Sequence, residues 1–460
     1  MQIQRKSGYK RIITNKKNYK QIQKKIELKR FLRRLRSKYI VKLRNGGKIN
    51  RLMCKKLHLK NKTSFYNKMG VSSKKYVYNR DVFNIKVPKT FDLSTDPEMV
   101  ISFLDKLKRD LNQKIAYDLY IDHSETESIN LDASFLFDKL IKDYSKYWSR
   151  LHIKIRISGK VSAHIEVNNF LLSFGLLNEL NITRHNLFPD KADRDYLDKY
   201  ITFKRNGNSY KTYLAGNIST ELVNYFDNCF KENEFKIKDD VKSSLVDCFG
   251  EIIKNAEEHS GKKKTEWIVL GCYTKSTHSC SFSIINYGNS FYQSLAKNES
   301  TAKEVLKEVS DIIYSHTNIV NKLILDKDIY EEAIWTYMAI QDGISSKRKE
   351  TGKTSTRGQG IMDVVQFIDQ IRNKEKRETH LSIISGNTFL SIDYEYPLIE
   401  KRVGKNQEIR RFLFLNKEAN FTNKPDLKKL RLIKSNFPGV IFSGYFIIDK
   451  DYQLSQMRSA

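Results

Sequence analysis

The basic residues of this chain are concentrated at its N-terminal end, and this segregation limits which part can form a folded core. Residues 1–80 contain 27 Lys and Arg residues and a single acid, Glu27, so they carry a net charge of +26. The rest of the 460-residue chain carries 56 bases and 52 acids, a net charge of +4. A block of like charge is typical of an arm that binds a polyanion, whereas the near-neutral remainder can form globular domains.

Within this arm, residues 18–44 place apolar side chains at helical spacing between Lys and Arg, and a glycine-containing run, Asn45-Gly46-Gly47, ends the pattern. We therefore predict a partly helical basic arm at 1–80, with nucleic acid as its first expected partner. Two alternatives stay open: an anionic membrane surface, and a solvated helix whose apolar stripe packs on the body of the protein.

The composition also limits where the chain functions. No run of 18 or more apolar residues is present, so we expect no membrane span, and the N-terminus lacks the apolar segment of a secretory signal. The five cysteines are odd in number and scattered, which fits a reducing compartment. These features predict a cytoplasmic protein.

Residues 85–220 alternate between expected strands and helices, which is typical of a small α/β domain. Strands are expected at 115–122 and 151–158, and helices at 97–113, 131–147 and 165–180. The order of these elements resembles a STAS domain, the fold of anti-sigma factor antagonists, over roughly residues 90–215. In that family a serine at the start of the helix after the first turn is phosphorylated by a partner kinase. The resemblance makes Ser134 the candidate, although the family's DSSG-like run is absent; the alternative is an ordinary residue of the first helical turn.

The most informative local pattern is the segment SSLVDCFGEIIKNAEEHSG at 243–261. Its apolar residues recur every three or four positions and predict a helix with one buried stripe. Glu251, Asn255, Glu258 and His259 project from an adjoining stripe, so a carboxylate lies one turn before a carboxamide and can line the same pocket. An amphipathic helix with a solvated polar side is the alternative.

This segment resembles the N box of the GHKL ATPases, the superfamily of histidine kinases, gyrase and Hsp90, and its ExxxNAxxH form is closest to the anti-sigma factor serine kinases. The resemblance implies that Glu251 is the general base and that Asn255 coordinates Mg²⁺. His259 matches a frequent position of the family and can equally be structural.

Further segments resemble the other boxes of the family in the same order. Strands at 266–273 and 280–286 lead to a turn in which Asn286 and Gly288 match the adenine-binding G1 box, with Asn286 in place of the usual Asp and Ser290 in place of a Gly. A largely helical lid is expected at about 292–360. It ends in a run that resembles the phosphate-binding G2 box and contains Arg357, Gly358, Gln359 and Gly360.

The last part of the chain resembles the closing strands of the family. A strand pair is expected at 380–395, and the closing strand at 437–448 contains Gly439, with a basic, unassigned insertion at about 397–436. The resemblance therefore implies a C-terminal GHKL-type α/β two-layer sandwich at 235–450, with ATP and Mg²⁺ as cofactors.

The function implied by the resemblance is that of an ATP-dependent regulatory switch, expected to be bacterial, which hydrolyses ATP. Two alternatives stay open: a serine/threonine kinase of the anti-sigma factor type, and a non-hydrolysing nucleotide sensor that binds nucleic acid. Glu251 serves either enzyme, because the same carboxylate can activate water or a hydroxyl group. A STAS-type or other protein partner and a homodimer are further expectations that the sequence leaves open.

Overall fold

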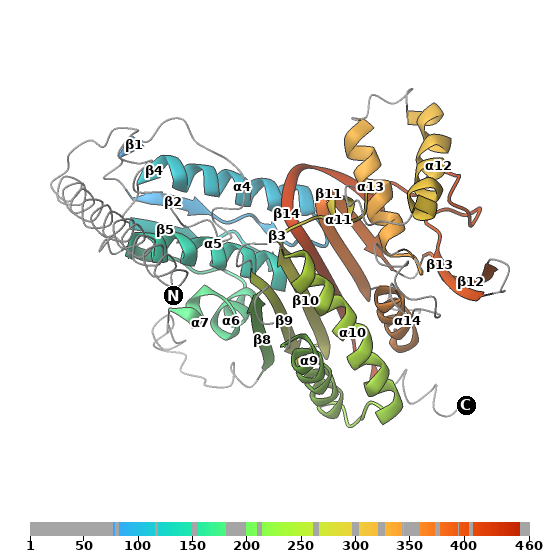
Figure 1. Ribbon diagram of the computed structural model, residues 1–460. Coiled ribbons are helices and arrows are strands. Elements are labelled where there is room, and N and C mark those ends of the chain that lie inside the picture. Colours follow the sequence, from blue (N-terminus) through green and yellow to red (C-terminus); the bar gives the residue numbers. More distant parts are fainter. Residues whose placement is uncertain are drawn as a thin grey trace, which may run out of the picture.

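The computed structural model describes most of the chain after the basic arm: residues 77–78, 82–115, 118–149, 155–180, 199–208, 214–260, 266–296, 303–320, 327–342, 344, 359–372, 378–393, 395–403 and 408–450. These residues form a mixed α/β structure that contains parallel and antiparallel sheets (Figure 1). The predicted arm therefore lies outside the described residues, except for Val77–Tyr78, and so do Arg357 and Gly358.

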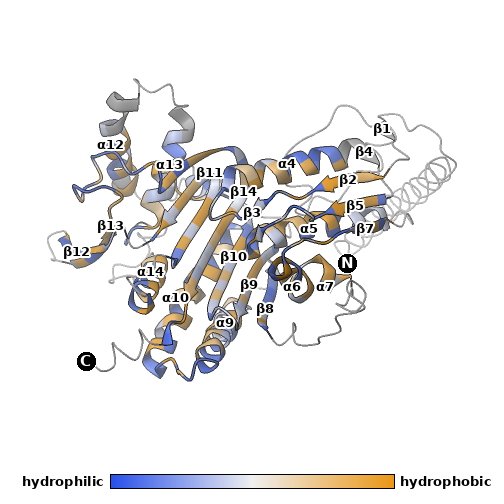
Figure 2. Ribbon diagram, turned by 180° about the vertical axis from the view of Figure 1, so that it is seen from behind, coloured by the Kyte–Doolittle hydropathy of each residue, from blue (hydrophilic) through white to orange (hydrophobic). Residues whose placement is uncertain are grey.

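A five-stranded antiparallel sheet forms the centre of the molecule. Its strand order is β11-β14-β10-β9-β8. The strands are β8 (Tyr200–Asn208), β9 (Glu266–Thr274), β10 (Ser279–Tyr287), β11 (His380–Ile392) and β14 (Leu430–Ile447). Burial on both faces explains why β9 is a nearly continuous apolar run, whereas β10, although almost wholly buried, alternates serine with Cys280, Phe282 and Ile284 (Figure 2).

One face of this sheet shares a large hydrophobic cluster with the helices that follow β8 in the chain. They are α9 (Leu214–Lys231), α10 (Asp239–His259), α11 (Phe291–Leu295), α12 (Lys303–Val320), α13 (Lys327–Ala339) and α14 (Gly360–Ile371). The predicted stripe of α10 is confirmed, because Leu245, Phe249, Ile252, Ile253 and Ala256 are all buried. The largely helical character expected after residue 292 is confirmed for α11, α12 and α13.

The opposite face of the sheet is covered by the N-terminal α/β unit. Its three-stranded parallel sheet has the order β2-β5-β7, and two short strand pairs, β1-β4 and β3-β6, accompany it. The elements are β1 (Val77–Tyr78), β2 (Phe83–Lys86), β3 (Thr90–Phe91), α4 (Pro97–Gln113), β4 (Lys114–Ile115), β5 (Asp118–Asp122), β6 (Ser128–Ile129), α5 (Leu131–Ser149), β7 (Arg156–Lys160), α6 (Ile165–Ser173) and α7 (Leu176–Glu179). The helix expected at 165–180 is thus split into two at Phe174 and Gly175.

Helices α4 and α5 join the two sheets into one body. Their apolar residues share a hydrophobic cluster with β2 and β5 and with back-face residues of the large sheet such as Leu270, Ile285 and Ile441. At its N-terminal end α4 also bonds to β14: the backbone N–H of Lys434 donates to Glu98 Oε2 at 2.6 Å, and the hydroxyls of Ser102 and Ser435 are 2.9 Å apart.

The structure corrects three predicted boundaries. β8 pairs with β9, so the large sheet begins at Tyr200 within the range assigned to the smaller domain. The pair expected at 380–395 is one strand, β11, whose partner β14 begins at Leu430 instead of 437. Both strands bend where their register shifts, near Gly386, whose φ of 59° lies in the left-handed region.

The segment predicted as an insertion contains a hairpin, a stretch of turns at 414–429 and the first part of the long closing strand. The hairpin strands are β12 (Leu398–Val403) and β13 (Glu408–Leu413), which pair only with each other among the described strands. Among all the residues that the structure describes, none of the helices is long and apolar enough to cross a membrane.

Candidate functional site

A cavity of about 460 Å³, counted with its open mouth, lies between α10, the end of β10, α11, the start of α14 and the middle of β14. Its walls are mostly apolar with a few polar side chains among them, as in pockets that bind small organic ligands. The lining residues are Ile252, Asn255, Ala256, His259, Ile284, Asn286, Asn289, Phe291, Ser294, Ile361, Val440 and Phe442.

The cavity brings together residues that the sequence analysis placed in separate boxes. Asn255 and His259 come from α10, and Asn286 comes from the end of β10. Asn255 is exposed at the rim, whereas Asn286 is almost fully buried in the sheet. Gln359 immediately precedes α14 as its N-cap, and its side chain makes no capping hydrogen bond.

Two predicted glycines lie where backbone segments pack too closely for a side chain. A Cβ on Gly288 would collide with the carbonyl oxygen of His259, the last residue of α10. The same turn is held by hydrogen bonds from Gly288 N to the carbonyl of Pro438 and from Asn289 N to the carbonyl of His259, at 3.1 and 3.0 Å. Gly439 has a φ of 148°, and a Cβ there would collide with the carbonyl oxygen of Asn286. These glycines thus shape the wall of the cavity.

The side-chain oxygen of Asn286 already has a backbone partner. Val440, which is the register partner of Asn286 in the antiparallel sheet, donates its N–H to Asn286 Oδ1 at 2.8 Å. Asn286 therefore ties β10 to β14 at the cavity wall. This bond joins residues 154 positions apart and was not anticipated from the sequence.

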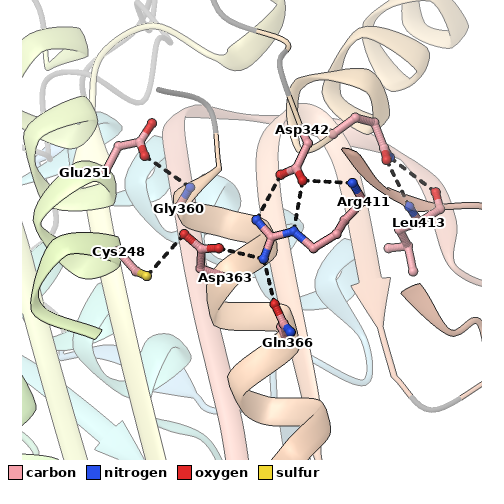
Figure 3. Close-up of polar contacts among 9 residues, drawn as sticks. Cys248, Glu251, Asp342, Gly360, Asp363, Gln366, Arg411 and Leu413 are labelled. Carbon is pink, nitrogen blue, oxygen red and sulfur yellow. Dashed lines mark hydrogen bonds and ion pairs between the residues drawn. The ribbon is translucent and has the colours of Figure 1, made fainter. Parts of the chain in front are cut away.

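Glu251 lies half-buried one turn before Asn255 and caps the start of α14. Its Oε2 accepts a hydrogen bond from the backbone N–H of Gly360 at 3.1 Å (Figure 3). The first N–H groups of a helix lack partners within the helix, and its dipole favours a negative charge there. Glu251 thus supplies at α14 the negative charge that an anionic ligand would otherwise supply.

Ser290, which replaces a glycine of the family pattern, begins a helix. Its Oγ accepts the backbone N–H of Gln293, and the Gln293 side chain accepts the N–H of Ser290, both at 3.2 Å. This is a capping box, and the spacing Ser-x-x-Gln in the sequence is the signal that could have predicted it.

A polar network next to the cavity was not predicted at all. Arg411 on β13 binds the carboxylate of Asp342 through Nε at 2.9 Å and through a second nitrogen at 3.2 Å. Its remaining terminal nitrogen contacts Asp363 Oδ1 at 2.6 Å and Gln366 Oε1 at 2.7 Å, both on α14. The thiol of Cys248 on α10 donates to Asp363 Oδ2 at 3.3 Å (Figure 3). No local sequence signal joins these residues.

Ser134 occupies a position that no kinase can reach in this structure. Its side chain is completely buried in the first turn of α5, and its Oγ contacts Asp138 Oδ2 at 3.5 Å. The structure therefore favours the alternative that Ser134 is an ordinary residue of the first helical turn.

Among the described residues, no group of three or more His, Cys, Asp or Glu side chains is arranged to hold a metal ion. A metal at this site would therefore need oxygen ligands from an amide, from water or from a ligand. No family model, no curated protein and no solved structure matches this chain.

Proposed function

We propose that the cavity binds ATP with Mg²⁺ and that the chain is a GHKL-type ATP-dependent regulatory switch. One observation carries the proposal: α10, the end of β10, the start of α14 and the middle of β14 all line one cavity. These are the four segments that resemble the boxes of the family. An apolar cavity into which a few polar side chains from separate segments converge is the expected place for a bound ligand.

The residues present fit such a ligand. Ile284, Val440 and Phe442 offer apolar walls to a flat base. Asn286 Oδ1 keeps a second lone pair for an amino group, since a carbonyl oxygen accepts two hydrogen bonds. The carboxamide oxygen of Asn255, exposed at the rim, is a ligand type that Mg²⁺ accepts.

Bound ATP would supply a phosphoryl group for transfer. The part of Glu251 in this proposal is to accept a proton from the attacking water. An ionised carboxylate has about four acceptor sites, so Glu251 can keep the N–H of Gly360 while it accepts a second hydrogen bond. A protein hydroxyl in place of water would make the protein a kinase.

We expect the affinity for ATP to fall when a larger side chain fills the cavity. Val440→Trp places a large side chain against the cavity wall, and we expect it to raise the Kd for ATP at least tenfold, about 1.4 kcal/mol. Val403→Trp on β12, away from the cavity, is the control. Isothermal titration with ATP, with and without Mg²⁺, measures both, and Asn255→Ala should remove the Mg²⁺ dependence.

Equal affinity of the wild type and Val440→Trp for ATP would overturn the proposal. If the wild type releases phosphate from ATP and Glu251→Ala does not, the protein hydrolyses ATP with the help of Glu251. Transfer of label from γ-labelled ATP to protein would assign the kinase activity instead.

The charge block at 1–80 favours a second binding function for the same chain. Because 27 basic residues face a single acid there, we propose that the arm binds nucleic acid through its phosphates. We expect the affinity for a mixed-sequence duplex to fall steeply between 50 and 200 mM salt, on the order of 10³-fold, and to disappear when residues 1–80 are deleted. Fluorescence anisotropy measures this, and an affinity that ignores salt would exclude it.

A further inference from the structure

We propose that Arg411 is a positioning residue, which holds α14 against α10 and so sets the geometry of Glu251 and Gly360 beside the cavity. The inference rests on the proposed function for its importance to ligand binding, but the contact itself can be tested without a ligand. Arg411 lies in the segment predicted as an insertion and does not line the cavity.

The contacts of Arg411 join two places that are distant in the sequence. Asp342 lies 69 residues before Arg411, just after α13, and is 3% exposed. Its carboxylate accepts three hydrogen bonds from Arg411: from the backbone N–H, from Nε and from a terminal nitrogen. Asp363 lies in the first turn of α14 and contacts the remaining terminal nitrogen at 2.6 Å. One guanidinium, whose side chain is 13% exposed, thus serves two carboxylates. A planar group with donors in a fixed fork defines direction as well as distance.

The strand that carries Arg411 is itself held in place by neutral hydrogen bonds. The hydroxyl of Tyr337 donates to the carbonyl of Leu413 at 2.9 Å and accepts the N–H of Leu415 at 2.9 Å. Gln341 Oε1 accepts the N–H of Leu413 at 3.0 Å. Both partners are buried on or just after α13, so β13 is a fixed base for Arg411 rather than a free hairpin.

The far side of Asp363 connects the network to α10. The thiol of Cys248 donates to Asp363 Oδ2, and three residues later on the same helix Glu251 accepts the N–H of Gly360. A Cβ on Gly360 would lie 3.0 Å from the carbonyl of Cys248, so the two helices are in close contact there. Arg411 therefore presses the first turn of α14 onto the turn of α10 that carries Cys248 and Glu251.

Cys248 offers a readout for this arrangement. Burial, followed by the neighbouring charge of Asp363, raises the pKa of the Cys248 thiol to about 12, while Arg411 acts in the opposite direction. Removing the Arg411 charge would by electrostatics alone raise this pKa further and slow alkylation, because the thiolate is the reactive form. Exposure of the thiol by a loosened α14 would instead speed alkylation. The two effects have opposite signs, so faster alkylation reports the loss of position.

The test measures the rate of Cys248 alkylation by iodoacetamide, peptide by peptide, in the full-length chain. We expect at least a tenfold increase in Arg411→Met, which keeps the length of the side chain, and a smaller one in Arg411→Lys, which keeps the charge but not the fork. Arg402→Met, an exposed arginine of the same hairpin, should keep the wild-type rate. An unchanged rate in Arg411→Met overturns the inference.

Loss of folding is distinguished by the buried core thiols Cys229 and Cys280, which should stay unreacted in every variant. If they react in Arg411→Met, Asp342→Asn decides the question. Asp342 binds Arg411 and makes no described hydrogen bond to Cys248, so a faster rate in Asp342→Asn with Cys229 and Cys280 unreacted supports the inference, and an unchanged rate overturns it.

ATP titration of the same variants separates this inference from the proposed function. Weaker ATP binding in Arg411→Met, partly restored in Arg411→Lys, supports positioning of the cavity. If the wild type binds no ATP but Arg411→Met still exposes Cys248, the proposed ligand is refuted and the role of Arg411 in positioning α14 stands. ATP binding that is equal in all variants overturns the link between Arg411 and the cavity.

Discussion

Replacing Gly439 with alanine is expected to destabilise the folded chain by about 3–5 kcal/mol. Two costs combine at this position. The φ of 148° is a conformation that residues with a side chain rarely adopt, and the added Cβ would collide with the carbonyl oxygen of Asn286. Because β14 must shift to relieve the collision, the bond from Val440 N to Asn286 Oδ1 should be lost as well.

Urea denaturation followed by circular dichroism measures the effect. Gly216→Ala is the matched control, since Gly216 lies in α9 and a Cβ there meets no atom within 4 Å. We expect the control to be stabilised by about 0.5–1 kcal/mol, because alanine favours a helix over glycine. Equal midpoints for the two variants would show that the backbone at Gly439 is not constrained as the structure indicates.

Replacing Asp132 with asparagine is expected to stabilise the chain at neutral pH. Asp132 lies in the first turn of α5, 5% exposed, where the N-terminal unit meets the large sheet. Burial raises the pKa of its carboxyl from 3.8 to about 6, while hydrogen bonds from Ser283 and Ser443 act against this shift and Asp92 adds to it. The uncharged side chain is therefore the form that the interface prefers.

The raised pKa sets the direction of the pH dependence. The native state holds this proton more tightly than the unfolded chain, so the stability from Asp132 is fully present below pH 3.8 and is lost as the pH rises through about 6. Above that pH the ionised group costs up to about 3 kcal/mol. Asp132→Asn should recover about 1–3 kcal/mol at pH 7.5 and remove this decline, as measured by urea midpoints from pH 4 to 8. Asp247→Asn, exposed on α10, is the control, and a parallel decline in both variants would contradict the assignment.

Local periodicity predicted the elements well where it was strong. The apolar residues of α10 recur at helical spacing, and the helix was expected within a few residues of its observed bounds, Asp239–His259. The hairpin of β9 and β10 was predicted equally closely, because an apolar run and an alternating run are separated by a short polar turn. In both cases the signal lies within one segment.

Pairings between distant segments could not be predicted in this way. β8 was not predicted as a strand, because only its first four residues, Tyr200 to Phe203, are strand-forming and a polar run with glycine follows, and nothing in its residues indicates that it pairs with β9. The length of β14 was missed because its first half pairs with β11 beyond a bend, where the register shifts.

The candidate site divides along the same line. Asn255 was identified from the helical pattern of its own segment and Asn286 from the resemblance to the G1 box, and both line the cavity. The bond between Asn286 and Val440 and the ion pairs of Arg411 depend on contacts 154 and 69 residues apart, which one sequence does not reveal. Pairs of this kind form only when the fold brings distant segments together. The basic insertion at about 397–436, which contains Arg411 and has no clear periodicity, therefore stayed unassigned in the sequence analysis.

The 18-residue length of β14 has a consequence for how this protein can be divided. Its first half is bonded to α4 through Lys434 and Ser435, and its second half supplies Val440 and Phe442 to the cavity. A fragment that begins after the N-terminal unit would expose the apolar back face of the large sheet to water. We therefore expect the smallest fragment that keeps the cavity intact to include α4 and α5.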